Sequence, residues 1–127
     1  MSWSWRRLIP SEYPLQRLIE ELNARLLSLS NSLAQGLEVR TVTASETLDR
    51  EDKVMLVDTS SGAVTLSLLP AAQLPGVEYH IKLIDATNNL TIDPDGSETI
   101  DGSTTLVVST VNVSYSIVSD GAQWWIV

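Results

Sequence analysis

The 127-residue sequence contains no cysteine, no phenylalanine and a single histidine, His80. The absence of cysteine excludes disulfides, thiolate metal sites and cysteine nucleophiles. No apolar run approaches the roughly 20 residues that a membrane-spanning helix requires. The apolar segment of a signal peptide is also missing after the two arginines near the start. We therefore expect a soluble protein that has no membrane partner and is made in a cytoplasm.

Acidic residues outnumber basic ones, and they are unevenly placed. Residues 1–37 carry four arginines and three glutamates, whereas residues 38–127 carry four basic and thirteen acidic residues, a net charge of −9. Because phosphate binding needs a positive surface, the acidic segment argues against nucleic acid as a partner. An acidic surface instead keeps an exposed domain in solution.

Leucine and isoleucine recur at alternating gaps of four and three residues between positions 15 and 33. The six residues are Leu15, Ile19, Leu22, Leu26, Leu29 and Leu33. This spacing is typical of the a and d positions of a coiled coil. Pro14 suits a first helical turn and Gly36 suits a helix end, so we expect a coiled-coil helix over residues 14–36.

A lone helix of three heptads is marginally stable in water. The apolar seam must therefore be buried against copies of the same helix or against the rest of the chain. Leu18 and Leu27 widen the stripe beyond a strict seam, which favours three or more neighbours over a two-stranded zipper.

Residues 1–13 combine Trp3 and Trp5 with Arg6 and Arg7. Prolines near the end of this segment discourage a continuous helix, so we expect an extended arm. Indole rings and guanidinium groups are effective anchors in protein interfaces. The arm either docks on another protein through these four residues or folds back onto its own helical bundle.

After residue 37 the apolar residues recur at every second position, between turns rich in Gly, Pro, Asn and Asp. This pattern predicts short strands, within residues 53–58, 64–68, 79–83, 90–92, 106–108, 111–118 and 123–127. Asp120-Gly121 predicts a hairpin. We expect residues 37–127 to form an antiparallel β-sandwich-like or barrel-like domain, without a repeat strong enough to indicate a solenoid.

No catalytic constellation is evident. A triad would require His80, but the sequence has no G-x-S-x-G elbow, and one histidine in an alternating strand is usually a surface residue. We therefore expect neither enzymatic activity nor a cofactor.

Four acidic residues between positions 93 and 101 raise the possibility of a calcium site. They are Asp93, Asp95, Glu98 and Asp101. Their spacing does not match the twelve-residue EF-hand loop. The interpretation that we favour is that these side chains cap backbone N–H groups of the turns, so no metal site is expected.

Trp124 and Trp125 are adjacent, so in a strand they face opposite sides. One ring belongs in the core. The other covers a neighbouring chain, remains exposed or stacks on a sugar.

Residues 54–127 contain, in order, VMLVDT, VTL, LPAA, PG, IKLIDAT, TIDP, GSETIDG and SDG with WIV. This ordered set resembles the small β modules of bacteriophage fibre and other virion appendage proteins. The resemblance implies a structural role in the virion, as a homotrimer with the module projecting outward and without catalytic residues.

The sequence thus leads us to expect a structural bacteriophage protein located in the virion, either a short homotrimeric fibre or a capsid decoration protein. Its fold would be mainly β with an N-terminal α-helix: a trimeric coiled-coil stalk followed by the β domain. Residues 1–13 would attach it to a capsid or tail protein. The alternative is a receptor- or glycan-binding tail fibre module that contacts the host surface.

Overall fold

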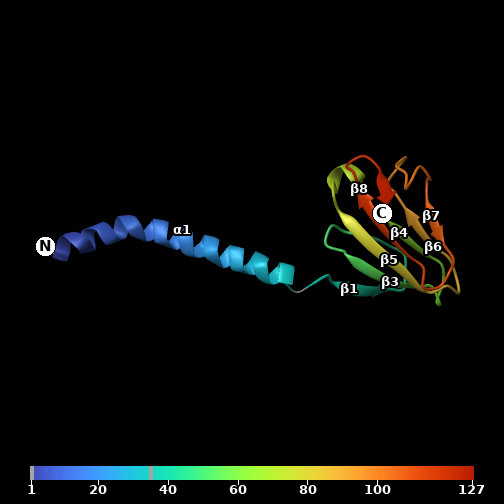
Figure 1. Ribbon diagram of the computed structural model, residues 1–127, viewed down its shortest axis with the longest axis horizontal. Helices are drawn as coiled ribbons and strands as arrows, with labels where there is room; N and C mark the ends of the chain where they lie inside the picture. The colour runs from blue at the N-terminus through green and yellow to red at the C-terminus, as the bar shows by residue number, and fades with distance from the viewer. Residues whose placement is uncertain (1, 35) are drawn as a thin grey trace. The chain divides into compact units, whose positions relative to one another are not determined.

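The computed structural model describes residues 2–34 and 36–127, with the side chains of residues 14–31 and 36–127. This described part contains one α-helix, one short 3-10 helix and nine strands. The chain divides into two compact units, Met1–Gly36 and Leu37–Val127. The division falls where the apolar period changes, from the helix to the strands (Figure 1). The protein is therefore mainly β with one N-terminal helix.

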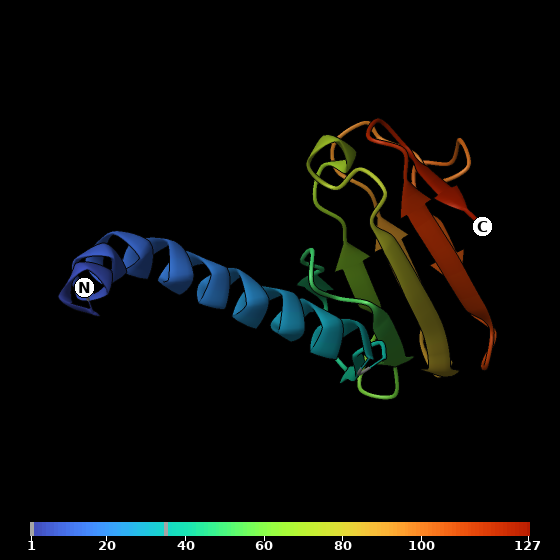
Figure 2. The same ribbon diagram turned by 60° about the vertical axis from the view of Figure 1, so that its left-hand side comes forward.

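Helix α1 spans Ser2–Ala34, so the prediction of an extended arm and of a helix start near Pro14 is wrong. A proline inside a helix removes one hydrogen bond and bends the helix without necessarily ending it. Pro10 and Pro14 are one turn apart, so both lost bonds fall on the same side, and the ribbon bends in this N-terminal part (Figures 1 and 2). At the other end, Gly36 has a φ of 80°, the left-handed conformation that commonly follows a helix.

The nine strands of the described part form two sheets. The five-stranded sheet has the order β1 (Val39–Val42), β3 (Val54–Asp58), β5 (Glu78–Asp85), β8 (Ser114–Ser119), β9 (Trp124–Ile126). The four-stranded sheet has the order β2 (Glu46–Thr47), β4 (Val64–Ser67), β6 (Leu90–Asp93), β7 (Leu106–Val108). The 3-10 helix η1 (Ala71–Gln73) follows β4.

The sheets are mixed, and the expected antiparallel arrangement is wrong for the first six strands. Strands β1, β3 and β5 pair in parallel, as do β2, β4 and β6. From β1 to β6 each successive strand lies in the other sheet, so neighbours within a sheet come from successive passes in the same direction. Only β7, β8 and β9 are added antiparallel, and the Asp120-Gly121 hairpin between β8 and β9 is confirmed.

Parallel stacking aligns similar residues from successive passes, a weak internal repeat that the sequence analysis missed. Val64-Thr65-Leu66 of β4 lies beside Leu90-Thr91-Ile92 of β6, and Asp58 at the end of β3 lies beside Asp85 at the end of β5. The first pass, through β1 and β2, is shorter and was not predicted as strands.

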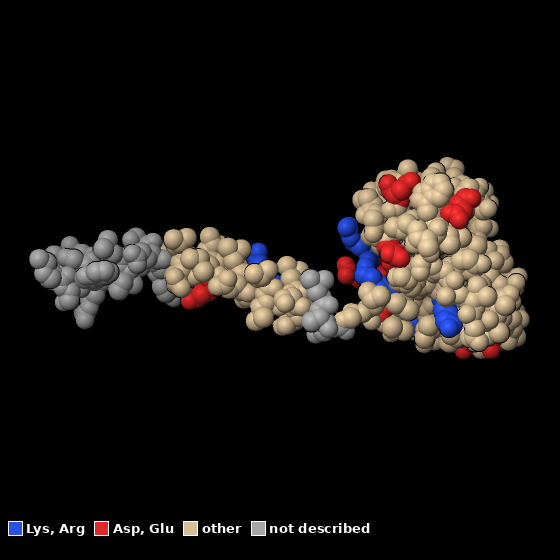
Figure 3. All heavy atoms as spheres, viewed as in Figure 1, with Lys and Arg blue, Asp and Glu red and all other residues tan. Residues whose placement is uncertain are grey.

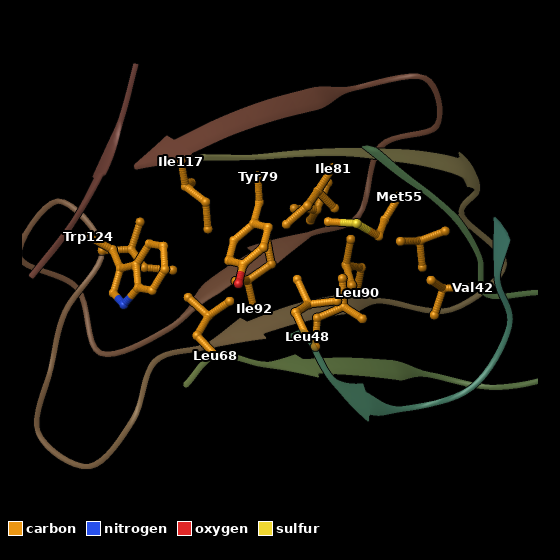
Figure 4. Packing of buried hydrophobic residues seen from close by; sticks show 14 of the residues in the cluster. Val42, Leu48, Met55, Leu68, Tyr79, Ile81, Leu90, Ile92, Ile117 and Trp124 are labelled. Atoms are coloured by element: carbon orange, nitrogen blue, oxygen red, sulfur yellow. The ribbon is translucent and has the colours of Figure 1, made fainter. Parts of the chain in front are cut away.

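One core lies between the two sheets (Figure 4). Its inward side chains alternate along the strands with outward ones, as the period of two requires. Trp124 and Tyr79 are fully buried and stacked, with ring centroids 5.7 Å apart. Burial, aided by the nearby charges of Asp52 and Asp49, raises the pKa of Tyr79 to about 12. Trp125 is 45% exposed, which confirms that the two adjacent indoles face opposite sides.

The first pass is also held by an ion-pair cluster. The Arg40 guanidinium on β1 binds the carboxylate of Glu46 on β2, and its Nε donates to Asp52 Oδ1 at 2.7 Å. Burial alone would raise the pKa of Asp52, but the bond from Arg40 and the backbone N–H bond outweigh it, so this pKa lies below its ordinary value. Arg40 therefore links both sheets at their first strands.

A buried threonine joins the turns that follow β3 and β5. The Thr59 hydroxyl lies 2.8 Å from the Asp85 carbonyl oxygen and 2.7 Å from that of Asn88, and it accepts from the Asn88 N–H at 3.1 Å. Asn88 Nδ2 in turn donates to the Thr59 carbonyl at 2.8 Å. Thr59 thus fixes the register between two successive passes of the chain.

The substitution Thr59→Val removes this hydroxyl while keeping the side-chain shape. It leaves buried backbone groups without their partner, so we expect the free energy of unfolding to fall by about 1–3 kcal/mol, measured by urea unfolding. Thr47→Val, at an exposed strand position, is the control and should change stability by less than about 0.5 kcal/mol. Equal effects of the two substitutions would contradict the role assigned to Thr59.

Candidate functional site

Taken by itself, helix α1 leaves a broad apolar stripe uncovered. The described seam residues, each between 42% and 67% exposed, are Leu15, Ile19, Leu22, Leu26 and Leu29. Leu18 and Leu27 widen the stripe and are similarly exposed. Covering a side chain of this size contributes roughly 1.5–3 kcal/mol, so the stripe strongly favours a partner.

The residues beside the seam are mostly uncharged. In the heptad numbering, the flanking e positions are Gln16, Asn23 and Ser30, and the described g positions are Leu18 and Arg25. Charge pairs at e and g usually select the partner and the relative direction of the helices. Here they are almost absent, so a partner of this stripe would be held by the apolar surface itself.

The structure does not describe the side chains of all the residues that we assigned to self-association or anchoring. Leu33 lies on α1, but its side chain is outside the described residues, and the same holds for Trp3, Trp5, Arg6 and Arg7. Both assignments therefore stay predictions.

The helical start at Ser2 extends the heptad register beyond the range that the sequence analysis considered. Counting back from Leu15 at d, Leu8 falls at d and Trp5 at a, whereas Trp3, Arg6 and Arg7 fall at f, b and c. Glu12 occupies the a position between Trp5 and Ile19, so the apolar spacing is interrupted in this part of the helix. The register therefore separates Trp5 from the other three predicted anchoring residues.

The histidine lies in a small polar cluster on the outer side of the five-stranded sheet. His80 Nδ1 is 2.7 Å from Ser116 Oγ, and Nε2 is 3.7 Å from Glu78 Oε1. These are the residue types of a hydrolytic triad, yet Ser116 lies within β8, which is paired on both sides. Because sheet pairing occupies the neighbouring N–H groups, the described strands offer this serine no preformed oxyanion hole.

An open hollow of about 460 Å³ lies next to this cluster. Its lining mixes the cations Arg50 and Lys53 with the carboxylates Glu51 and Glu78, so it has no single charge preference. Nothing in this lining indicates one class of ligand.

Two of the four acidic residues, Glu98 and Asp101, accept from backbone N–H groups, but these groups belong to η1 and β9 and not to the acidic turns themselves. The Glu98 carboxylate accepts from the Ala71 N–H at 3.0 and 3.1 Å, and Asp101 Oδ1 accepts from the Ile126 N–H at 3.0 Å. Across the described residues, no three His, Cys, Asp or Glu side chains are grouped to hold a metal ion. Within that same part of the chain, no helix combines the length and apolar character needed to span a membrane.

Comparison with known proteins adds no relative. No protein-family model matches the sequence, and no curated protein matches it. The helix stripe is therefore the candidate functional site on physical grounds alone.

If the stripe is a self-association seam, charges within it will separate the chains. Leu22→Asp with Leu26→Asp places unpaired carboxylates in the seam, where burial is costly. We expect light scattering to give about three times the 13.9 kDa chain mass for the native protein and a lower mass for this double variant.

The matched control is Ala24→Asp with Asn31→Asp, which adds the same charge at two f positions on the opposite side of α1. This control should keep the native mass. An unchanged mass in the seam variant would mean that the β unit alone sets the oligomer.

Proposed function

We propose that the protein is a structural subunit of a bacteriophage virion, a short homotrimeric fibre or capsid decoration protein. The uncovered stripe of α1 is the observation that carries this proposal. A helix of this kind is unfinished as a single copy, and identical helices supply the simplest complementary surface. The resemblance of residues 54–127 to phage appendage modules supports the assignment to a virion.

The stripe is wider than a two-stranded seam needs, because Leu18 and Leu27 flank it on both sides. Three helices around one axis cover more of such a stripe than two helices do. The β units, all attached at the C-terminal ends of their helices, would lie together beyond one end of a parallel bundle. This arrangement makes α1 the stalk and the β unit the exposed end.

Residues 1–13 would attach the fibre to the particle. Counted in heptads from Leu15, Trp5 has the a position of the proposed seam, and Trp3, Arg6 and Arg7 have the f, b and c positions. Residues outside the seam remain available to a capsid or tail protein, with the guanidinium groups suited to carboxylates on that partner.

The anchoring role can be tested without disturbing the seam. Replacing Trp3, Arg6 and Arg7 by alanine should leave the oligomer mass unchanged but release the protein from purified particles, as measured by co-sedimentation. The control replaces Arg17 and Arg25 by alanine, which removes the same number of basic groups further along α1. Retention of the first variant on particles would show that another surface is the anchor.

A second candidate function, binding of a host-surface glycan, is favoured by one observation. The exposed Trp125 ring is held by a 2.8 Å bond from its Nε1 to Asp120 Oδ2. An exposed aromatic ring held in this way can stack on the apolar face of a sugar.

Glycan binding predicts that a host-surface polysaccharide binds the native oligomer and that Trp125→Ala abolishes this binding in calorimetry. Val107→Ala, another exposed strand residue, should not change it. Absence of binding to host-derived polysaccharide by the native protein would leave the purely structural role.

A further inference from the structure

The outer faces of the two sheets differ in chemistry. On the four-stranded sheet the outward positions are polar except for Val107. They are Thr47, Thr65, Ser67, Thr91 and Asp93. A face of this kind needs no cover, because its side chains bind water well.

Apart from Ile84 near the irregular end of β5, the outward apolar side chains of the five-stranded sheet come from its other four strands. They are Val39 on β1, Val54 and Leu56 on β3, Val118 on β8, Trp125 on β9 and Val127 directly after it. We call these six residues the apolar outer face. Val39, Trp125 and Val127 are 56%, 45% and 70% exposed, so the chain's own β unit leaves them largely uncovered. Large exposed apolar patches mark interaction surfaces.

The strand register shows how this face is organised. Val39 pairs with Val54 and Val118 pairs with Trp125, which makes two apolar areas on either side of β5. Between them β5 places the outward residues Glu78, His80 and Lys82. His80 is already bonded to Ser116, so the polar strip satisfies part of its own hydrogen-bonding capacity.

The charges of the face favour a second copy of the same acidic unit. His80 and Lys82 each lie in a row of residues paired across neighbouring strands. These rows contain no carboxylate, since the strand neighbours of His80 and Lys82 are Val54, Ser116, Leu56 and Ser114. Glu78 in the next row offsets Lys82, and Asp120 borders the face through its bond to Trp125 Nε1. Residues 38–127 as a whole carry a net charge of −9, and acidic groups are spread over the side of the β unit drawn in Figure 3. Copies that approach through this face therefore meet less repulsion than through any strongly acidic surface.

Chain connectivity brings the copies close enough for this contact. Only residues 35–38 separate α1 from β1, so β1 begins within about 20 Å of the end of its own helix. Helices joined along their stripe thus hold three β units at high effective concentration, where a modest patch is sufficient for association.

We propose that the apolar outer face is a second self-association surface, on which the five-stranded sheets of the helix-joined copies pack around the common axis. This inference rests on the proposed self-association through α1. It assigns Trp125 to the interface between copies, whereas the glycan alternative requires that ring to be free.

The absence of cysteine allows a direct test in the full-length chain. Single variants Ser114→Cys and Thr47→Cys place a thiol on the five-stranded and four-stranded outer faces, respectively, at positions exposed in the single chain. Each is reacted with the disulfide reagent DTNB in the native background and in the Leu22→Asp, Leu26→Asp background, while light scattering reports the mass. Normalising each rate to the seam-variant background removes the effect of local charge on the thiol.

We expect the thiol at position 114 to react about tenfold more slowly in the oligomer than in the seam variant, because reaction then requires the interface to open. The thiol at position 47 should react at the same rate in both backgrounds. Slow reaction at position 114 that persists in a monomeric seam variant would mean that the chain covers its own face, and would overturn the inference.

The remaining outcomes separate the two proposals. An oligomer of native mass with no protection at position 114 overturns the outer-face inference and leaves the helix seam intact. A native chain that is monomeric overturns both.

Discussion

Burial of the leucine stripe on α1 is the constraint on which the rest of this protein depends. The helix has a wide apolar surface, few charges beside it and no second element within its own unit to cover it. An isolated helix gains little from its backbone hydrogen bonds in water, and most of its stability in proteins comes from packing of the apolar face. If the stripe is a self-association seam, as we propose, assembly is part of the folding of this segment and a single chain is an incomplete state.

The β unit is built on a different principle. Its core takes residues from both sheets, and it encloses the stacked pair Tyr79 and Trp124 without any contribution from another chain. Thr59 and Asn88 lock successive passes at one end, while Arg40 links the first strands of both sheets. A unit that is complete inside can still use its surface for contacts between copies. The contrast between its two outer faces therefore does not follow from the internal core, and our proposal attributes it to association.

The sequence predicted the local elements better than their arrangement. Alternation located β3 to β9 because inward and outward residues differ in polarity along each of these strands. It could not reveal that β3 and β5 are parallel, since the period of two is the same in either direction and depends only on which face is buried. Strands β1 and β2 were missed because they are short and carry the ion pair of Arg40 and Glu46 where a hydrophobic pattern was sought. The spacing from Leu15 to Leu33 predicted a helix, which is confirmed, and a seam, which stays a prediction; Pro10 was given too much weight as a helix breaker.

The pair Trp124 and Trp125 shows why the surfaces are harder to predict than the core. Sequence alone places the two rings on opposite sides of a strand, but only the sheet order tells that Trp125 lies opposite Val118, on the same side as Val54 and Leu56. The apolar outer face combines β1 and β3 near the start of the β unit with β8 and β9 near its end, so no local pattern contains it. Its position after the helix has a further consequence for the assembly. In the proposed assembly, the stripe contact and the sheet-face contact are linked through residues 35–38 and reinforce one another, since closing either one raises the effective concentration for the other. Neither proposed contact then has to be strong alone, because such a fibre would dissociate only when both contacts open together.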